Sequence, residues 1–212
     1  MPIERGYSQP MTTLLTPRLR LVPMADTHLQ GLFEMNREPE VMRYITGKPD
    51  TIEDTQAMID RVKARWAEWG YSWWTFFERD TGQIVGAGCV QHLGRDQALP
   101  HELGWRLRPD RWSRGYASEA ARRMAAFAFD DLRAPQLVAF CDQENAGSSH
   151  VMEKLGMRFR GIEHWYDFDG AVYGMTVDEW RACPASSKAA QEIAAVAGEG
   201  RSASAAQSPP TK

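Results

Sequence analysis

One short segment of the chain, residues 105–120, combines the end of a strand, a glycine turn and the start of a helix. Gly115 permits a backbone conformation that a side chain would hinder, and the helix-forming sequence after it carries Glu119 in its first turn. The N-terminus of such a helix offers unpaired N–H groups and a positive dipole end to an anion. Arg111 and Arg114 add positive charge beside it. The segment therefore predicts a site for a ligand that carries phosphates.

The elements around this segment predict a sheet with helices packed against it. Periodicity and turn residues indicate the order β-α-α-β-β-β-α-β-α-β-β. Because three strands follow one another before the helix at 115–132, a doubly wound parallel sheet is disfavoured. We expect an α/β (α+β) fold with a mixed, mostly antiparallel sheet of six to seven strands and helices on both faces. The predicted strands cover residues 18–22, 72–78, 84–92, 102–108, 136–141, 157–168 and 171–180, and the predicted helices cover residues 26–36, 39–44, 51–69, 115–132 and 145–156.

Composition divides the chain into three parts. Residues 1–13 are expected to form a flexible leader and residues 14–183 one domain. The segment 184–212 is rich in Ala, Ser, Gly and Gln and has few large apolar side chains. Such a segment cannot bury enough apolar surface to offset its ordering entropy, so we expect a disordered C-terminal tail.

Charge and cysteine content limit the class of protein. A net charge of -3 and a pI of about 6.0 argue against nucleic acid as the main partner. The three cysteines are far apart and do not have the spacing of a metal site. A small, odd number of cysteines favours a reducing compartment over a disulfide scaffold. The sequence contains no apolar run of membrane-spanning length and no signal-peptide pattern. We therefore expect a cytoplasmic protein with neither a membrane nor a metal as partner.

Four segments together resemble the GNAT superfamily of acyl-CoA-dependent N-acetyltransferases, and most of all the branch of the ribosomal-protein N-terminal (alanine/serine) acetyltransferases. They are residues 39–44, 81–86, 102–120 and 145–157. Their order and spacing match over roughly residues 14–180. The resemblance implies acetyl-CoA as co-substrate and, at the level of the family, a homodimer.

The resemblance also implies which residues bind acetyl-CoA. The backbone of Trp105 and Leu107, at a bulged strand end, would face the acetyl carbonyl and pantetheine, and amides from Ser113 to Ala117 would hold the pyrophosphate. Trp112 stands where the family often has Gln or Arg. The complete predicted set is Trp105, Leu107, Trp112, Ser113, Arg114, Gly115, Tyr116, Ala117, Asn145 and Ser148.

The proton donor to the departing thiolate is expected on the helix at 145–156. Many family members place a Tyr four residues before the glycine that ends this helix, but Met152 stands there and cannot donate a proton. In the ribosomal-protein branch, a Ser at the position of Ser148 is thought to serve. Ser148 could equally help to cap the helix, and Asn145 could orient pantetheine or act as the N-cap.

A base must remove the proton of the ammonium group before the amine can attack. Glu102 is the best acidic candidate, because it lies on the strand that would line the acyl site, and a water could complete the relay. Asp167 and Glu163 near the tip of the last hairpin could also meet a cationic amine, although surface charge is the favoured interpretation for both. The loop histidines His92 and His101 are expected to be solvated.

The sequence leaves the acceptor open. We expect an enzyme that transfers an acetyl group to a primary amine by direct attack in a ternary complex, with a protein N-terminal α-amine as the first candidate acceptor. A small amine (polyamine, amino acid or aminoglycoside) is the alternative, and a non-catalytic acyl-CoA-binding module is the alternative from another class. The acceptor groove is expected from residues 39–49, 71–74 and 165–173; a closed acidic pocket there would favour polycations.

Overall fold

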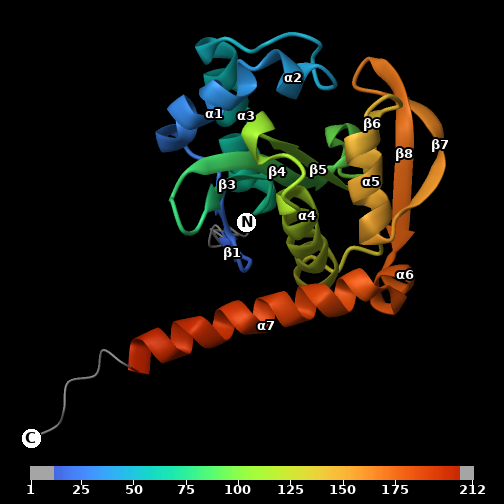
Figure 1. The fold of residues 1–212 in the computed structure, drawn as a ribbon. Helices are drawn as coiled ribbons and strands as arrows, with labels where there is room; N and C mark the ends of the chain where they lie inside the picture. The colour runs from blue at the N-terminus through green and yellow to red at the C-terminus, as the bar shows by residue number, and fades with distance from the viewer. Residues whose placement is uncertain (1–11, 206–212) are drawn as a thin grey trace, which may run out of the picture.

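The computed structural model describes residues 12–205, so residues 1–11 of the expected leader and residues 206–212 of the expected tail lie outside the described part. A sheet of eight strands in the order β1-β2-β3-β4-β5-β6-β8-β7 forms its centre (Figure 1). Every neighbouring pair is antiparallel except β5 and β6, which are parallel. The strands are β1 (Leu14–Leu15), β2 (Leu19–Pro23), β3 (Trp73–Glu78), β4 (Ile84–His92), β5 (His101–Leu107), β6 (Gln136–Asp142), β7 (Arg158–Trp165) and β8 (Phe168–Thr176).

This architecture confirms the expected mixed, mostly antiparallel sheet, with one strand more than expected. The additional strand, β1, has two residues. Two residues are too short for a periodic pattern, which is why the sequence did not indicate the strand.

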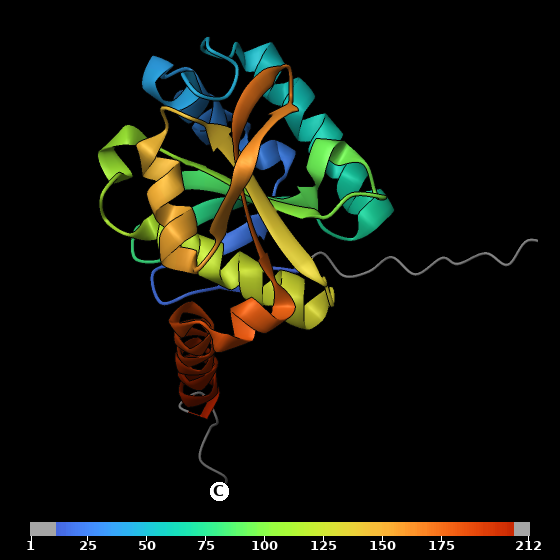
Figure 2. The same ribbon diagram turned by 90° about the vertical axis from the view of Figure 1, so that its right-hand side faces the viewer.

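Helices cover both faces of the sheet. Viewed from the β7–β8 edge, α3 lies on one side and α4 and α5 on the other (Figure 2). The helices are α1 (Leu29–Asn36), α2 (Pro39–Met42), α3 (Ile52–Trp69), α4 (Tyr116–Ala126), α5 (Ala146–Leu155), α6 (Val177–Ala182) and α7 (Pro184–Ala205). No helix within residues 12–205 is long and apolar enough to cross a membrane.

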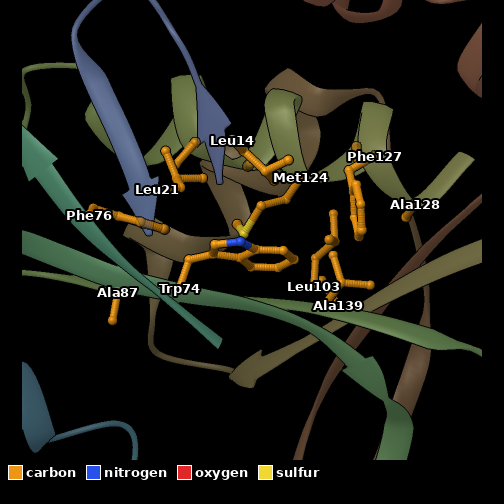
Figure 3. Packing of buried hydrophobic residues seen from close by; sticks show 14 of the residues in the cluster. Leu14, Leu21, Trp74, Phe76, Ala87, Leu103, Met124, Phe127, Ala128 and Ala139 are labelled. Atoms are coloured by element: carbon orange, nitrogen blue, oxygen red, sulfur yellow. The ribbon is translucent and has the colours of Figure 1, made fainter. Parts of the chain in front are cut away.

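The core on the α4 side is built around Trp74. Its indole is fully buried and meets Phe127 edge-on at 5.5 Å between ring centroids. Leu103 of β5 and Met124 of α4 lie around it, whereas Ala87 points to the opposite face (Figure 3). Since side chains alternate along a strand, the neighbouring Trp73 lies on the face opposite Trp74.

Side-chain caps set the limits of α3 and α5, as the sequence indicated. Thr51 and Asp54 form a reciprocal capping box at the start of α3, with the Asp54 N–H donating to Thr51 Oγ1 at 3.1 Å. The side chain of Asn145 accepts from the Ser148 N–H at 3.1 Å and so caps α5. Gly156 has φ +94° just after the last residue of α5, a conformation that glycine adopts without steric cost.

The predicted strands 157–168 and 171–180 place the turn of the last hairpin at Asp169-Gly170, but the chain turns earlier. Tyr166 and Asp167, with φ of +54° and +72°, form the turn, and the Asp169-Gly170 pair lies inside β8. A Cβ atom on Gly170 would lie 2.5 Å from the Phe140 ring, so this glycine serves close packing instead of a turn. The predicted strand over 171–180 also ends early, because Thr176 and Glu179 form a capping box that starts α6.

The expectation of a disordered tail is wrong for residues 184–205, which form α7. The buried residues Ala185, Ala189 and Val196 lie on one side of this helix, and Glu192 pairs with Arg122 of α4 at 2.6 Å. Figure 1 shows α7 running across the lower end of α4 towards β1. Small side chains suffice here because the helix buries a narrow face against α4. The domain limits at residues 14 and 183 stay a prediction.

Candidate active site

A cleft of about 570 Å³ opens between β5, the start of α4, and α5. Glu40 and Tyr44, from the segment that contains α2, line one of its walls. Nine of the ten residues predicted to bind acetyl-CoA also line it, and the tenth, Arg114, does not. The nine are Trp105, Leu107, Trp112, Ser113, Gly115, Tyr116, Ala117, Asn145 and Ser148.

The cleft exists because β5 and β6 separate. Their pairing covers only His101 to Leu103 of β5, opposite Leu137 to Ala139 of β6. Arg108 donates its N–H to Val85 of β4, and the alternation of an antiparallel ladder therefore directs the backbone groups of Trp105 and Leu107 away from β4, towards the gap.

The strand end itself is not bulged, in contrast to the expectation. The register between β4 and β5 is continuous from His101 to Leu107. Separation from β6 is therefore what frees the backbone of β5. The carbonyl of Leu107 accepts a hydrogen bond from the Trp112 indole at 2.9 Å, which ties the following loop to the strand.

The loop before α4 has the backbone geometry of an anion site. Ser113 and Gly115 have φ of +59° and +79°, and Arg114 between them does not have positive φ. Alternation of this kind turns successive N–H groups towards one side. Gly115 is also the N-cap residue of α4 and provides no side-chain cap, so the amides of the first turn remain available.

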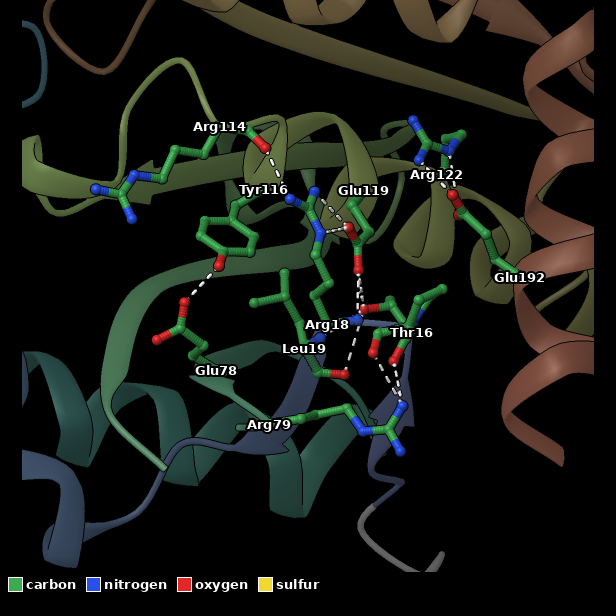
Figure 4. A network of polar contacts seen from close by, with 11 residues as sticks. Thr16, Arg18, Leu19, Glu78, Arg79, Arg114, Tyr116, Glu119, Arg122 and Glu192 are labelled. Carbon is green, nitrogen blue, oxygen red and sulfur yellow. Dashed lines mark hydrogen bonds and ion pairs between the residues drawn. The ribbon is translucent and has the colours of Figure 1, made fainter. Parts of the chain in front are cut away.

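A polar network behind the loop holds it in place (Figure 4). Arg18, the residue before β2, donates through Nη1 to the Arg114 carbonyl at 2.9 Å and pairs with Glu119 of α4 at 2.7 Å. Thr16 donates to the same buried carboxylate at 2.6 Å. The Tyr116 ring lies under the Arg18 guanidinium, and its hydroxyl donates to Glu78. Arg114 thus contributes a carbonyl to the support of the loop, and its neighbours face the cleft.

The α5 side of the cleft offers one free hydroxyl. Asn145 caps the helix by accepting a hydrogen bond from the Ser148 N–H, so Asn145 is the N-cap and the Ser148 side chain is not needed for capping. Within residues 12–205 the Ser148 hydroxyl has no hydrogen-bond partner, whereas that of Ser149 donates to the Asn145 carbonyl at 3.4 Å. Met152 is buried and does not line the cleft.

Glu102 lies away from the cleft wall. Its side chain is 6% exposed, on the face of β5 opposite Leu103. Gln91 donates to its carboxylate at 3.1 Å, and so does the Tyr166 hydroxyl. Burial raises the pKa of Glu102, although the Tyr166 and Gln91 hydrogen bonds oppose that rise. A carboxylate with a raised pKa is a suitable general base near neutral pH.

The two other acidic candidates are surface residues of the last hairpin. Asp167 is exposed in the turn, and Glu163 is exposed on β7 and accepts from the Trp165 indole at 2.8 Å. Tyr166, between them in sequence, is the hairpin residue that contacts Glu102. The sequence did not indicate this contact, since it joins residues 64 positions apart.

In contrast to the expectation, His92 and His101 are not solvated. The hydroxyl of Tyr71 lies 2.9 Å from Nε2 of both His92 and His101. Burial lowers the pKa of His101 to about 4, and the neighbouring His92 adds to this effect. His101 is therefore neutral at pH 7, and the Tyr71 hydroxyl joins the end of α3 to both histidines of β4 and β5.

The chain is similar to known acetyltransferases along most of its length. Residues 18–158 match the family described as acetyltransferase (GNAT) domain. An uncharacterized N-acetyltransferase of Bacillus subtilis, YnaD, is 28% identical over 79% of this chain and 98% of its own length. The FsC-acetyl coenzyme A-N(2)-transacetylase of Aspergillus fumigatus is 28% identical over 79% of this chain and 77% of its own.

A solved structure has the same fold. The ribosomal L7/L12 alpha-N-protein acetyltransferase RimL, in complex with coenzyme A, superposes with a TM-score of 0.67 over 79% of this chain and 99% of its own, at 14% identity. The family match covers residues from β2 to the start of β7 and so contains the cleft, the loop before α4 and Glu102. The chain belongs to the GNAT family of acetyltransferases, and it is an acetyl-CoA-dependent N-acetyltransferase.

Proposed function

We propose that the enzyme acetylates a primary amine by direct attack on acetyl-CoA in a ternary complex, and that the first acceptor to test is a protein N-terminal α-amine. The observation that carries the proposal is the cleft that joins the anion-binding loop to the unpaired backbone edge of β5. The fold shared with RimL, an α-N-protein acetyltransferase, supports the choice of acceptor.

The cleft would divide acetyl-CoA binding between two backbone surfaces. The N–H groups of residues 113–117 would hold the pyrophosphate. The backbone groups of Trp105 and Leu107 that face the gap would pair with pantetheine and polarise the thioester carbonyl. Neither role needs a charged side chain, which agrees with the position of Arg114 outside the cleft wall.

The reaction would move two protons. The amine nitrogen attacks the carbonyl carbon, the carbon–sulfur bond breaks, and the amine proton passes to Glu102 through a water, because the carboxylate is buried behind the strand. The departing sulfur takes the proton of the Ser148 hydroxyl, which then regains one from solvent. Met152 cannot supply this proton, and Ser148 is the hydroxyl on the α5 wall without a partner among the described residues.

Thiol release from acetyl-CoA tests the proposal. The panel contains peptides with free N-termini, the same peptides with blocked N-termini, and small amines. We expect release with at least one free amine and none with the blocked peptides. Glu102→Gln should lower turnover by about 10²–10⁴-fold, the usual contribution of a general base, and Ser148→Ala should lower kcat.

Two matched variants serve as controls. Ser149→Ala removes a neighbouring hydroxyl of α5 that does not line the cleft, and Glu163→Gln removes an exposed carboxylate of β7. Both should keep normal turnover. Unchanged turnover in Glu102→Gln and Ser148→Ala would contradict the assigned roles. Binding of coenzyme A without thiol release from any amine would favour the non-catalytic binding module.

A further inference from the structure

A buried arginine of β5 borders the cleft, on the face of the strand that also carries Glu102. Arg106 is 9% exposed, its guanidinium lies 5.1 Å from the centroid of the Trp73 ring, and Nη2 lies 3.8 Å from the Met58 sulfur. Among the described residues, its buried Nε has no hydrogen-bond partner. A buried N–H group without an acceptor is costly, so Arg106 has a donor free for a ligand, as do Arg111 and Arg123.

A second arginine flanks Glu102 from the other direction. Arg95, in the loop between β4 and β5, lies over the Tyr166 ring at 5.4 Å from its centroid, and the Tyr166 hydroxyl donates to Glu102. On the side of Arg106, the Trp73 indole donates to Gln91, and Gln91 donates to Glu102. The candidate base thus lies between two cations, each stacked on an aromatic ring.

Helix α3 brings two further cations to the same face. Arg61 and Arg65 follow Met58 at helical spacings of three and seven residues, and Met58 contacts Arg106, so this side of α3 faces β5. Within the described part of the chain, none of Arg61, Arg65, Arg95 and Arg106 has a carboxylate at ion-pair distance. Three carboxylates lie within electrostatic reach of these arginines: Glu102 near Arg95, the half-buried Asp50 near Arg106 and Arg61, and Asp54 near Arg61.

We propose that the acceptor amine carries a carboxylate, that Arg106 binds this carboxylate on the Glu102 side of β5, and that Arg95 attracts it electrostatically from the other side of Glu102. The inference rests on the proposed function and narrows its substrate class. A polyamine or an aminoglycoside would bring several positive charges towards Arg65, Arg95 and Arg106 and would be repelled by them. A carboxylate would satisfy the planar donors of a guanidinium, which bind carboxylates in a fork. It could be the α-carboxylate of a free amino acid or the acidic side chain of an N-terminal residue.

Thiol release with paired amines tests this inference and separates the two sources. Alanine is compared with alaninamide, a peptide beginning with Asp is compared with the same peptide beginning with Asn, and spermidine represents polycations. We expect the charged member of one pair to have a kcat/KM higher by about 10- to 100-fold, as expected for hydrogen bonds to a charged group. A preference within the first pair identifies a free amino acid, and a preference within the second identifies an acidic N-terminus.

The variants Arg106→Met and Arg95→Gln test whether these two arginines cause the preference for a carboxylate-bearing amine. Both should raise KM for the carboxylate-bearing amine and leave KM for its neutral partner unchanged. Arg95→Gln keeps the test valid if the buried Arg106→Met variant does not fold, because Arg95 is exposed. Arg181→Gln, an exposed arginine of α6, is the control and should keep the preference.

Two results would overturn the inference while acetyl transfer stands. One is a higher kcat/KM for spermidine or for the neutral member of both pairs. The other is a carboxylate preference that survives both Arg106→Met and Arg95→Gln. Absence of thiol release with every amine is a distinct result, and it would remove the proposed function together with the inference.

Discussion

Arg18 and Glu119, 101 residues apart in sequence, form an ion pair of 2.7 Å whose arginine also donates to the carbonyl of the loop that precedes α4. The Glu119 side chain is buried, and Arg18 covers it from the solvent side. The pair therefore links the segment just before β2 to the loop proposed to bind pyrophosphate. Its two functions, stability of the fold and position of the loop, can be measured separately.

We expect Arg18→Met to weaken both properties. Loss of the guanidinium leaves a buried carboxylate short of donors, which costs about 1–3 kcal/mol in the free energy of unfolding. It also releases the Arg114 carbonyl, so the Kd for coenzyme A should rise. Urea denaturation and calorimetric titration measure the two effects. Arg158→Met removes an exposed cation near Glu179 and should change neither by more than the modest amount typical of surface pairs.

Gly115→Ala should weaken coenzyme A binding through the backbone alone. The φ of +79° at Gly115 costs an L-residue about 1–2 kcal/mol. An added Cβ would lie 3.5 Å from Arg18, an ordinary contact, so a steric clash is not the cause. Gly82→Ala imposes a similar strain at φ +69° in the β3–β4 hairpin. We expect both variants to lose stability and only Gly115→Ala to lose affinity; equal affinities would contradict the role of the loop.

Tyr166→Phe should move the acidic limb of the pH–rate profile to higher pH. Burial raises the pKa of Glu102, and the Tyr166 hydrogen bond lowers it by stabilising the carboxylate. Removing this bond raises the pKa further, so the base becomes protonated at a higher pH as the solution is acidified. The limb is measured in kcat/KM for the enzyme and the variant. Tyr173→Phe, on β8, should leave it in place, and a shift of the Tyr166→Phe limb to lower pH would exclude Glu102 as the base.

Ala189→Asp should detach α7 from the body of the protein. Ala189 is 2% exposed against the rest of the fold, so a carboxylate there is buried without a partner. We expect a loss of about 2–4 kcal/mol, in the range for uncompensated burial of a polar group, and faster cleavage after residue 184 in limited proteolysis. Ala190→Asp is the control, because it places the same charge at the next residue, which is exposed. Identical proteolysis of the two variants would show that α7 does not dock.

Local chemistry explains which elements the sequence predicted. Thr51, Asn145 and Gly156 limit helices through hydrogen bonds and φ values that belong to neighbouring residues, so these limits could be derived. Gly170 was misleading because its small size serves contact with Phe140, a tertiary requirement that resembles a turn signal. Helix α7 was missed because alanine gives little apolar contrast, and only its contact with α4 shows which side is buried.

In the candidate site, too, features set by neighbouring residues could be predicted from the sequence, and features set by tertiary contacts could not. The loop before α4 could be predicted because Gly115 and the helix start are adjacent in sequence. The surroundings of Glu102 could not, because Gln91 and Tyr166 reach it from other strands and from the hairpin turn. Its raised pKa depends on burial, which only the folded sheet provides.

The position of α7 has a consequence for synthesis of the chain on the ribosome. When α6 has been made, all eight strands already exist, yet the side of α4 that receives Ala189 and Glu192 is still uncovered. Glu199 then pairs with Arg79, 120 residues earlier, which also donates to the carbonyls of Thr16 and Pro17 at the edge of β2. Helix α7 thus stabilises the segment between β1 and β2 only after residue 199 has been synthesised, and a chain released before this residue lacks the ion pair with Arg79.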